Sequence, residues 1–165
     1  MNPPSIVACM LTGLIALPSI VNAHNSGARS NSTPVPQITE QATPVVAVVE
    51  QFAAALKSGD LKRAGDLLAD DVLILESGSA ERSRQEYLGH HAAADAAFLK
   101  GAQIEVKLRT ARVEGAFAWV GTESELRTTR NGAPLTLLST ETTALKNTSG
   151  VWRIVHIHWS SHVKS

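Results

Sequence analysis

The second half of this chain consists of long β segments with only short turns between them. Runs rich in β-branched and aromatic residues predict four strands, Gln103–Glu114, Phe117–Thr129, Leu135–Lys146 and Val151–Ser161. Turn signals lie between them at Gly115, Asn131–Gly132 and Asn147–Gly150. Strands joined by such short turns pair antiparallel, so this half predicts a sheet built from hairpins.

The first half carries helical patterns instead. A first helix is predicted over residues 43–59, because a Thr-Pro start is followed by apolar residues at helical spacing: Val45, Val49, Phe52 and Leu56. Asp60 can cap a short second helix, and Val72–Leu75 has the length and composition of a buried strand. A capping box predicts a third helix over residues 83–100. Helices followed by hairpins indicate an α+β fold, with an antiparallel sheet packed on three N-terminal helices.

Length and charge limit the kind of protein this is. The chain has 165 residues, which predicts one domain with its own core, over residues 44–165. Residues 24–43 are rich in Ser, Asn, Thr and Pro and predict a flexible linker. Lys and Arg number 15, as do Asp and Glu. This balance, without a basic cluster, argues against a nucleic-acid partner.

Residues 1–23 have the pattern of a secretory signal peptide. They carry no charged side chain, contain the apolar run Ile6–Leu17, and offer a small-residue cleavage site after Ala23. The apolar run is shorter than the roughly 20 residues that span a bilayer, so we expect no stable membrane anchor after cleavage. The mature chain would be secreted or periplasmic and would lack Cys9, the only cysteine of the sequence.

The last predicted strand carries two histidines on one face. Strict alternation puts His156 and His158 on the same side as Trp152 and Ile154. The opposite side then carries Val155, Ile157 and Trp159. Both faces are bulky and apolar, whereas a sheet solvated on one side alternates more cleanly. We therefore expect one face to cover the helices and the other to form a homodimer with a second copy of the chain.

A second histidine pair lies in the third predicted helix. Helical spacing places His91 on one face with Tyr87 and Phe98, while His90 lies near the edge of that face. Asp95 follows His91 by four residues, where it can accept a hydrogen bond from the imidazole. The spacing predicts a His–Asp pair that faces the interior.

A compact fold can bring the two histidine pairs to one cavity. Proton-transfer chemistry there would fall to His91, Asp95 and His156. The candidate ligand-binding residues are Tyr87, His90, Phe98, Trp152, His158 and Glu141. Further carboxylates that can join them are Glu76, Glu123 and Glu125.

A metal site is the alternative use of the histidines. Two imidazoles separated by one residue on a strand can bind zinc or copper, with a helix histidine as a third ligand. The candidate ligands are His91, His156 and His158. We expect no other cofactor.

Three segments carry a resemblance to a known family. They are Leu56-Lys57-Ser58-Gly59-Asp60, the segment His90-His91-x₃-Asp95, and W-R-I-V-H-I-H-W-S-S at residues 152–161. Together with the order of elements, they resemble the SnoaL-like branch of the nuclear-transport-factor-2-like superfamily, over about Pro44 to His162. The resemblance implies a curved antiparallel sheet that forms a cone around three helices, with a pocket at the open end. It also implies homodimers through the outer face of the sheet.

The same resemblance implies a small hydrophobic or aromatic ligand. Members with known activity include isomerases, dehydratases and cyclases, which use Asp, His or Tyr side chains as general acids or bases. No position of this chain is matched to the catalytic carboxylate of the steroid isomerases, so enzyme activity stays open. The alternatives are ligand binding without turnover, a metal-binding periplasmic protein, and a non-catalytic dimerisation module.

Overall fold

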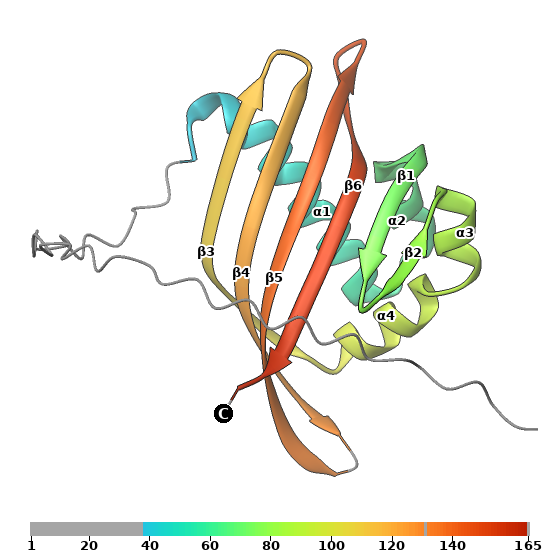
Figure 1. Ribbon diagram of the computed structural model, residues 1–165, viewed down its shortest axis with the longest axis vertical. Coiled ribbons are helices and arrows are strands. Elements are labelled where there is room, and N and C mark those ends of the chain that lie inside the picture. The colour runs from blue at the N-terminus through green and yellow to red at the C-terminus, as the bar shows by residue number, and fades with distance from the viewer. Residues whose placement is uncertain (1–37, 131, 165) are drawn as a thin grey trace, which may run out of the picture. The chain divides into compact units, whose positions relative to one another are not determined.

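The computed structural model describes residues 38–130 and 132–164, and the predicted signal peptide lies outside them. The first elements are the 3₁₀ helix η1 (Glu40–Ala42) and the helices α1 (Thr43–Ser58) and α2 (Leu61–Leu67) (Figure 1). Ala42 is fully buried, so the last residues of the predicted linker belong to the folded domain. No helix within the described ranges has the length and apolar character needed to cross a bilayer.

The predicted ends of the first two helices are confirmed. Gly59 follows α1 with φ +80°, a left-handed conformation that glycine adopts without steric cost. The Asp60 carboxylate then accepts a 2.9 Å hydrogen bond from the Arg63 backbone N–H and caps α2.

Six strands form one sheet, in the spatial order β2-β1-β6-β5-β4-β3. Their bounds are β1 Leu68–Glu76, β2 Ser79–Glu81, β3 Gln103–Glu114, β4 Phe117–Arg130, β5 Ala133–Thr148 and β6 Val151–Val163. The four predicted hairpin strands are confirmed, while the short edge strand β2 was not predicted. The purely antiparallel sheet is wrong in one pairing, because β1 runs parallel to β6. Three hairpins join β3 to β6, so β6 runs antiparallel to β3. It lies beside β1 and runs in the same direction as β1.

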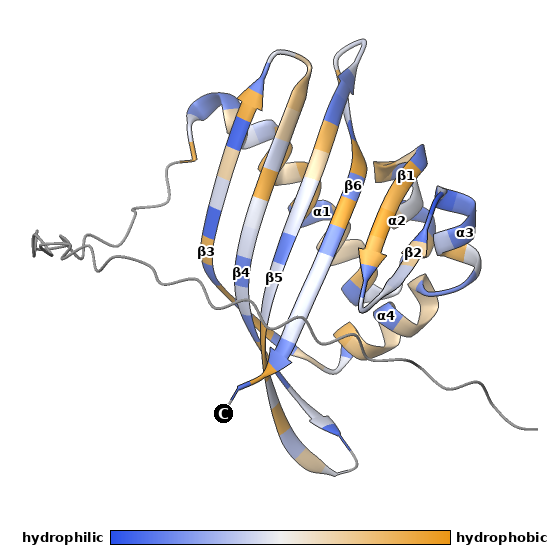
Figure 2. Ribbon diagram, viewed as in Figure 1, coloured by the Kyte–Doolittle hydropathy of each residue, from blue (hydrophilic) through white to orange (hydrophobic). Residues whose placement is uncertain are grey.

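The helices cover one face of the sheet. In Figure 1, α1 runs across the back of the strands, and α2 lies with the later helices beside β1 and β2. The buried side chains between helices and sheet form one hydrophobic core, whose largest fully buried members are Tyr87, Leu56, Leu68, Ile74, Leu145, Ile154 and Ile157. Figure 2 shows an apolar stretch of β1, whose Val72 and Ile74 are fully buried in this core.

The third predicted helix is broken into two. The chain forms α3 (Arg84–Gly89) and α4 (Ala92–Lys100), separated at His90 and His91. The predicted capping is confirmed, since the Ser83 hydroxyl accepts a 3.0 Å hydrogen bond from the Glu86 backbone N–H. Gly89 is a poor helix former, and His90 leaves the helical region with φ −120° and ψ −78°. The break changes which way His91 points relative to Asp95.

A β-bulge in β6 changes which residues share a face. Leu145 pairs with Ile154 and Ala144 with His156, so Val155 has no partner of its own on β5. The extra residue lets Ile154 and Ile157 both reach the core, where each is fully buried. The predicted face that combined Ile154 with His156 is therefore wrong.

This register gives a direct stability test. Replacing Ile157 by Ala removes a fully buried side chain, so we expect the free energy of unfolding to fall by about 2–5 kcal/mol. His158 is the exposed neighbour on the opposite face, and we expect His158→Ala to change stability by no more than about 0.5 kcal/mol. Urea unfolding of both variants measures this. Equal losses would contradict the register.

Candidate functional site

A cavity of about 180 Å³ opens between the helices and the inner face of the sheet. Its helical wall comes from α1 and α4, through Val49, Phe52, Ala53, Leu56, Asp95, Phe98 and Leu99. Its sheet wall comes from β3 to β6 and the end of β1. Most of the wall is apolar, so its few charged groups lie in an environment that disfavours charge.

One row of inward-facing residues crosses five strands of the sheet wall. Cross-strand register pairs Arg109 with Thr122, Thr122 with Glu141, and Glu141 with Trp159. Trp159 in turn pairs with Glu76 at the end of β1. All five residues line the cavity. Sheet register therefore gathers two carboxylates, a guanidinium and an indole that are far apart in sequence.

Asp95 faces this row from α4. The buried Tyr87 hydroxyl donates a 2.9 Å hydrogen bond to Asp95 Oδ2. Burial raises the pKa of the Asp95 carboxyl, while the hydrogen bond from Tyr87 and the nearby His91 partly offset that rise. The same burial, next to the Asp95 charge, raises the pKa of the Tyr87 phenol and keeps it protonated as a donor. One carboxylate oxygen is thus held by Tyr87.

Glu76 lines the same cavity as Asp95 and is coupled to it. Burial raises the pKa of the Glu76 carboxyl, and the negative charge of Asp95 raises it further. Two carboxyl groups that share a partly buried site do not ionise together easily, so Glu76 is harder to ionise when Asp95 is charged.

Glu141 holds the indole of the row in place. Its carboxylate accepts a 2.6 Å hydrogen bond from Trp159 Nε1 and a 2.7 Å bond from the Thr143 hydroxyl. The Trp159 ring stacks on Phe52 of α1, with ring centroids 6.4 Å apart and planes 14° apart. Both oxygens of Glu141 therefore serve to fix the pocket wall.

Arg109 lies at the β3 end of the row. Its guanidinium pairs with Glu50 of α1 at 2.6 Å, and its Nε donates to the Thr122 hydroxyl at 3.3 Å. The side chain is 14% exposed and paired, so it ties the edge strand to α1.

The predicted His91–Asp95 hydrogen bond is wrong. His91 lies at the helix break with its side chain 52% exposed, and its Nδ1 contacts the Glu81 carboxylate on β2. Asp95 instead receives its hydrogen bond from Tyr87. His91 does not line the cavity, although its charge is close enough to lower the pKa values of Asp95 and Glu76.

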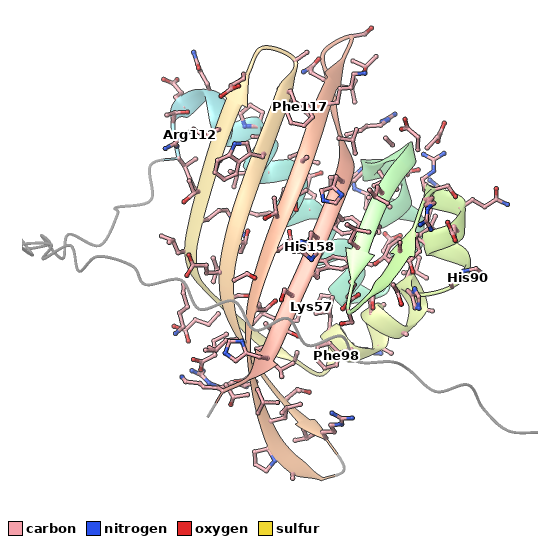
Figure 3. The ribbon with its side chains drawn as sticks, viewed as in Figure 1. Lys57, His90, Phe98, Arg112, Phe117 and His158 are labelled. Atoms are coloured by element: carbon pink, nitrogen blue, oxygen red, sulfur yellow. The ribbon has the colours of Figure 1, made fainter. Side chains whose placement is uncertain are left out.

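The other predicted histidines lie outside the cavity. His156 and His158 share a face, as predicted, but it is the outer face, where His156 Nδ1 hydrogen bonds to the Leu73 carbonyl at 2.9 Å. His90 is exposed at the end of α3, well away from His158 (Figure 3). The expected common histidine cavity is therefore absent from the described part of the chain.

The histidines also fail as a metal site. Within residues 38–130 and 132–164, no three His, Cys, Asp or Glu side chains are grouped closely enough to hold a metal ion. His91 is at the α3–α4 break, whereas His156 and His158 are on the outer face of β6. The predicted His91, His156 and His158 set is thus corrected.

Some predicted ligand-binding residues do lie at the cavity and others do not. Phe98 and Glu141 line it, and Tyr87 lies behind Asp95. Trp152 instead packs against the hydrophobic core. Of the further carboxylates, Glu125 lies on the outer face with Lys164 and Arg127.

The functional residues that sequence reasoning missed are the sheet residues of the charged row, apart from Glu76 and Glu141. Arg109, Thr122 and Trp159 meet only through pairings that join β3 to β6. Alternation alone assigned Trp159 to the face opposite the site. A bulge at Val155 reverses that assignment, and the sequence carries no glycine there to mark it.

Comparison with known proteins identifies the family. The SnoaL-like domain family matches residues 45–164, nearly all of the described domain. The chain therefore belongs to the SnoaL-like family of the nuclear-transport-factor-2-like superfamily. No curated protein matches the chain significantly in sequence.

Solved structures share the fold. A candidate ketosteroid isomerase from Shewanella frigidimarina is 37% identical, with a TM-score of 0.67 over 69% of this chain and 92% of that one. A candidate dehydratase of the NTF2-like family from Streptomyces avermitilis is 18% identical, with a TM-score of 0.61 over 72% and 93%. The association domain of Caenorhabditis elegans CaMKII is 18% identical, with a TM-score of 0.61 over 73% and 95%.

The raised pKa of Glu76 makes stability depend on pH. A carboxyl whose pKa is higher in the folded state stabilises the fold most below its ordinary value of 4.5, and this contribution is lost as the pH rises through the folded pKa. We therefore expect Glu76→Gln to raise Tm at pH 7 and to have little effect near pH 4. Thermal unfolding across this range measures the difference.

Glu123→Gln is the matched control for this test. Glu123 is exposed on the outer face of β4 and does not line the cavity, so its substitution is expected to leave Tm at pH 7 close to the wild-type value. A Glu76→Gln variant that is less stable than the wild type at pH 7 would contradict a desolvated Glu76.

Proposed function

We propose that this domain binds a small, largely apolar carbonyl compound and moves a proton on the carbon next to the carbonyl group. The observation that carries the proposal is the pair of carboxyl groups, Asp95 and Glu76, in one mostly apolar cavity. Their raised pKa values suit proton exchange near neutral pH better than ordinary carboxyls do. The cavity volume of about 180 Å³ suits one or two rings, since an apolar cavity of about 150 Å³ holds benzene.

Asp95 is the general base of this proposal. Tyr87 occupies Oδ2, which leaves Oδ1 to accept the proton from the substrate carbon. The proton's bonding electrons pass into the carbon–carbon bond, and the carbonyl oxygen gains negative charge. The hydrogen bond from Tyr87 orients the Asp95 carboxylate and leaves Oδ1 free to accept the proton.

Glu76 is the general acid. In its protonated form it donates a hydrogen bond, and then its proton, to the carbonyl oxygen as that oxygen becomes negative. When Asp95 returns its proton to a different carbon of an unsaturated substrate, the enol hydroxyl gives its proton back to Glu76 and the result is an isomerisation. When the protonated Asp95 instead protonates a hydroxyl group on the next carbon, that group leaves as water, the enol hydroxyl again returns its proton to Glu76, and the result is a dehydration. Both reactions use the same first step.

The similar proteins support this class of chemistry. The Shewanella frigidimarina protein is described as a candidate ketosteroid isomerase, and the Streptomyces avermitilis protein as a candidate dehydratase. Membership of the SnoaL-like family agrees with a ligand-binding or isomerase-type domain.

Exchange of hydrogen for deuterium tests the proton transfer without the natural substrate. 2-Tetralone, a two-ring ketone, is incubated with the protein in D₂O and followed by proton NMR. We expect the wild type to accelerate exchange next to the carbonyl and Asp95→Asn to lose about 100-fold or more of that rate. His158→Ala, on the outer face, should keep the wild-type rate.

The pH dependence of the same exchange distinguishes Asp95 from other bases. The rate should fall as the pH drops through the raised pKa of Asp95, because protonation removes the base. Tyr87→Phe deletes a hydrogen bond that lowers this pKa, so its acid limb should move to higher pH. An unchanged limb in Tyr87→Phe, or full exchange by Asp95→Asn, would contradict the assignment.

We further propose a homodimer through the outer face of the sheet. This face exposes Leu73, Phe117 and Trp119, with Trp119 39% exposed, and such apolar groups are costly to leave in water. Phe117 is visible at the upper end of β4 in Figure 3. The CaMKII association domain, whose name indicates assembly, shares the fold.

A charge on this face tests the assembly. We expect sedimentation equilibrium to give twice the chain mass for the wild type and one chain mass for Trp119→Glu, because the interface would bury an unpaired charge. Lys57→Glu on the exposed side of α1 is the control and should remain dimeric. A monomeric wild type would rule the dimer out.

A further inference from the structure

Glu81 is a buried carboxylate that the proposed proton transfer does not use. It lies on the short strand β2 and is only 3% exposed. Within the described residues its side chain has one recorded partner, Nδ1 of His91. A carboxylate is costly to bury without a partner, so this contact fixes where His91 can lie.

The two ends of this contact belong to the two segments that carry the proposed acid and base. On one side, β1 and β2 form a hairpin in which Glu76 pairs with Ser79 and Ile74 pairs with Glu81. The hairpin therefore carries Glu76 at its turn and Glu81 at its far strand.

On the other side, His91 immediately precedes α4. The Asp95 backbone N–H donates a 3.0 Å hydrogen bond to the His91 carbonyl, which makes His91 part of the first turn that positions Asp95. Because the helix breaks at His90, α3 does not fix the direction of α4. The N-terminal end of α4 therefore has to be held by contacts of its own.

We propose that the Glu81–His91 contact is a positioning tie that sets the separation between the Glu76 and Asp95 carboxyl groups. It links the β1–β2 hairpin directly to the start of α4, behind the cavity and without touching it. Tyr87 adds a second attachment of Asp95, from α3. The tie deepens the proposed function, since it gives His91 a positioning role in place of a catalytic one.

The charged groups around the tie agree with this role. His91 is close enough to Asp95 and Glu76 to lower both of their pKa values, while it contacts Glu81 directly. A carboxyl pair is sensitive to its separation, because the interaction of two charges falls with distance. Cutting the tie should therefore weaken the coupling between Glu76 and Asp95.

The test measures that coupling by carboxyl-carbon NMR on the full domain. The pKa of Glu76 is titrated with Asp95 present and with Asp95→Asn, and the difference between the two is the coupling. We expect the combined Glu81→Leu and His91→Leu variant to reduce this coupling to about half or less. Comparing differences cancels the direct effect of removing the His91 charge.

The matched control is His90→Leu. His90 is the exposed neighbour of His91, so its loss should leave the coupling at the wild-type value. Glu81→Gln keeps a hydrogen-bonding partner for His91 and should also keep the coupling, even if the leucine pair does not fold.

The outcomes separate this proposal from the proposed function. The tie is overturned if the combined Glu81→Leu and His91→Leu variant folds and keeps the full coupling between Glu76 and Asp95. It is also overturned if Glu81→Gln loses as much of that coupling as the combined variant does. If the combined Glu81→Leu and His91→Leu variant does not fold, His91→Ala, which has no side-chain atom that can reach Glu81, must show the reduced coupling instead. Failure of 2-tetralone exchange in the wild type would overturn the reaction and leave the measured coupling, and with it the tie, standing.

Discussion

The register of the last strand determines what the cavity contains. Val155 is an extra residue in β6, and the bulge lets Ile154 and Ile157 reach the core on either side of it. Beyond the bulge, the same face presents Trp159 to the cavity and leaves the histidines outside. Because a one-residue shift reverses every side chain of a strand, the character of the site depends on this one irregularity.

The site that results concentrates charge where the surroundings are mostly apolar. Glu76 and Asp95 lie against the apolar walls of α1 and α4, and burial is the largest cause of the raised pKa of each. Partly buried carboxyl groups of this kind lower the free energy of unfolding at neutral pH. Strongly perturbed ionisable groups cluster at functional sites, where stability is often traded for activity. The hydrogen bond from Tyr87 and the Glu81–His91 contact hold the pair in place.

Local sequence signals predicted the elements well, because caps and turns act over a few residues. The predicted helix end at Gly59 and the predicted N-caps at Asp60 and Ser83 are confirmed. The site was harder to predict, since it depends on long-range register. The helix break changes which way His91 points, and the bulge changes which side chains of β6 face the cavity. Both depend on tertiary packing, which the spacing of nearby residues does not encode. Asp95 does line the cavity, but its hydrogen-bond partner is Tyr87 and not His91.

Asp95 and Glu76 share a partly desolvated cavity, in which burial makes each carboxyl group harder to ionise and the charge of Asp95 opposes ionisation of Glu76. A direct measurement is a carboxyl-carbon NMR titration of the wild-type protein, which follows both side chains separately. The account predicts that both titrate above their ordinary values of 3.8 and 4.5, with Glu76 changing ionisation only after Asp95 is charged. Two independent titrations at the ordinary values would contradict it.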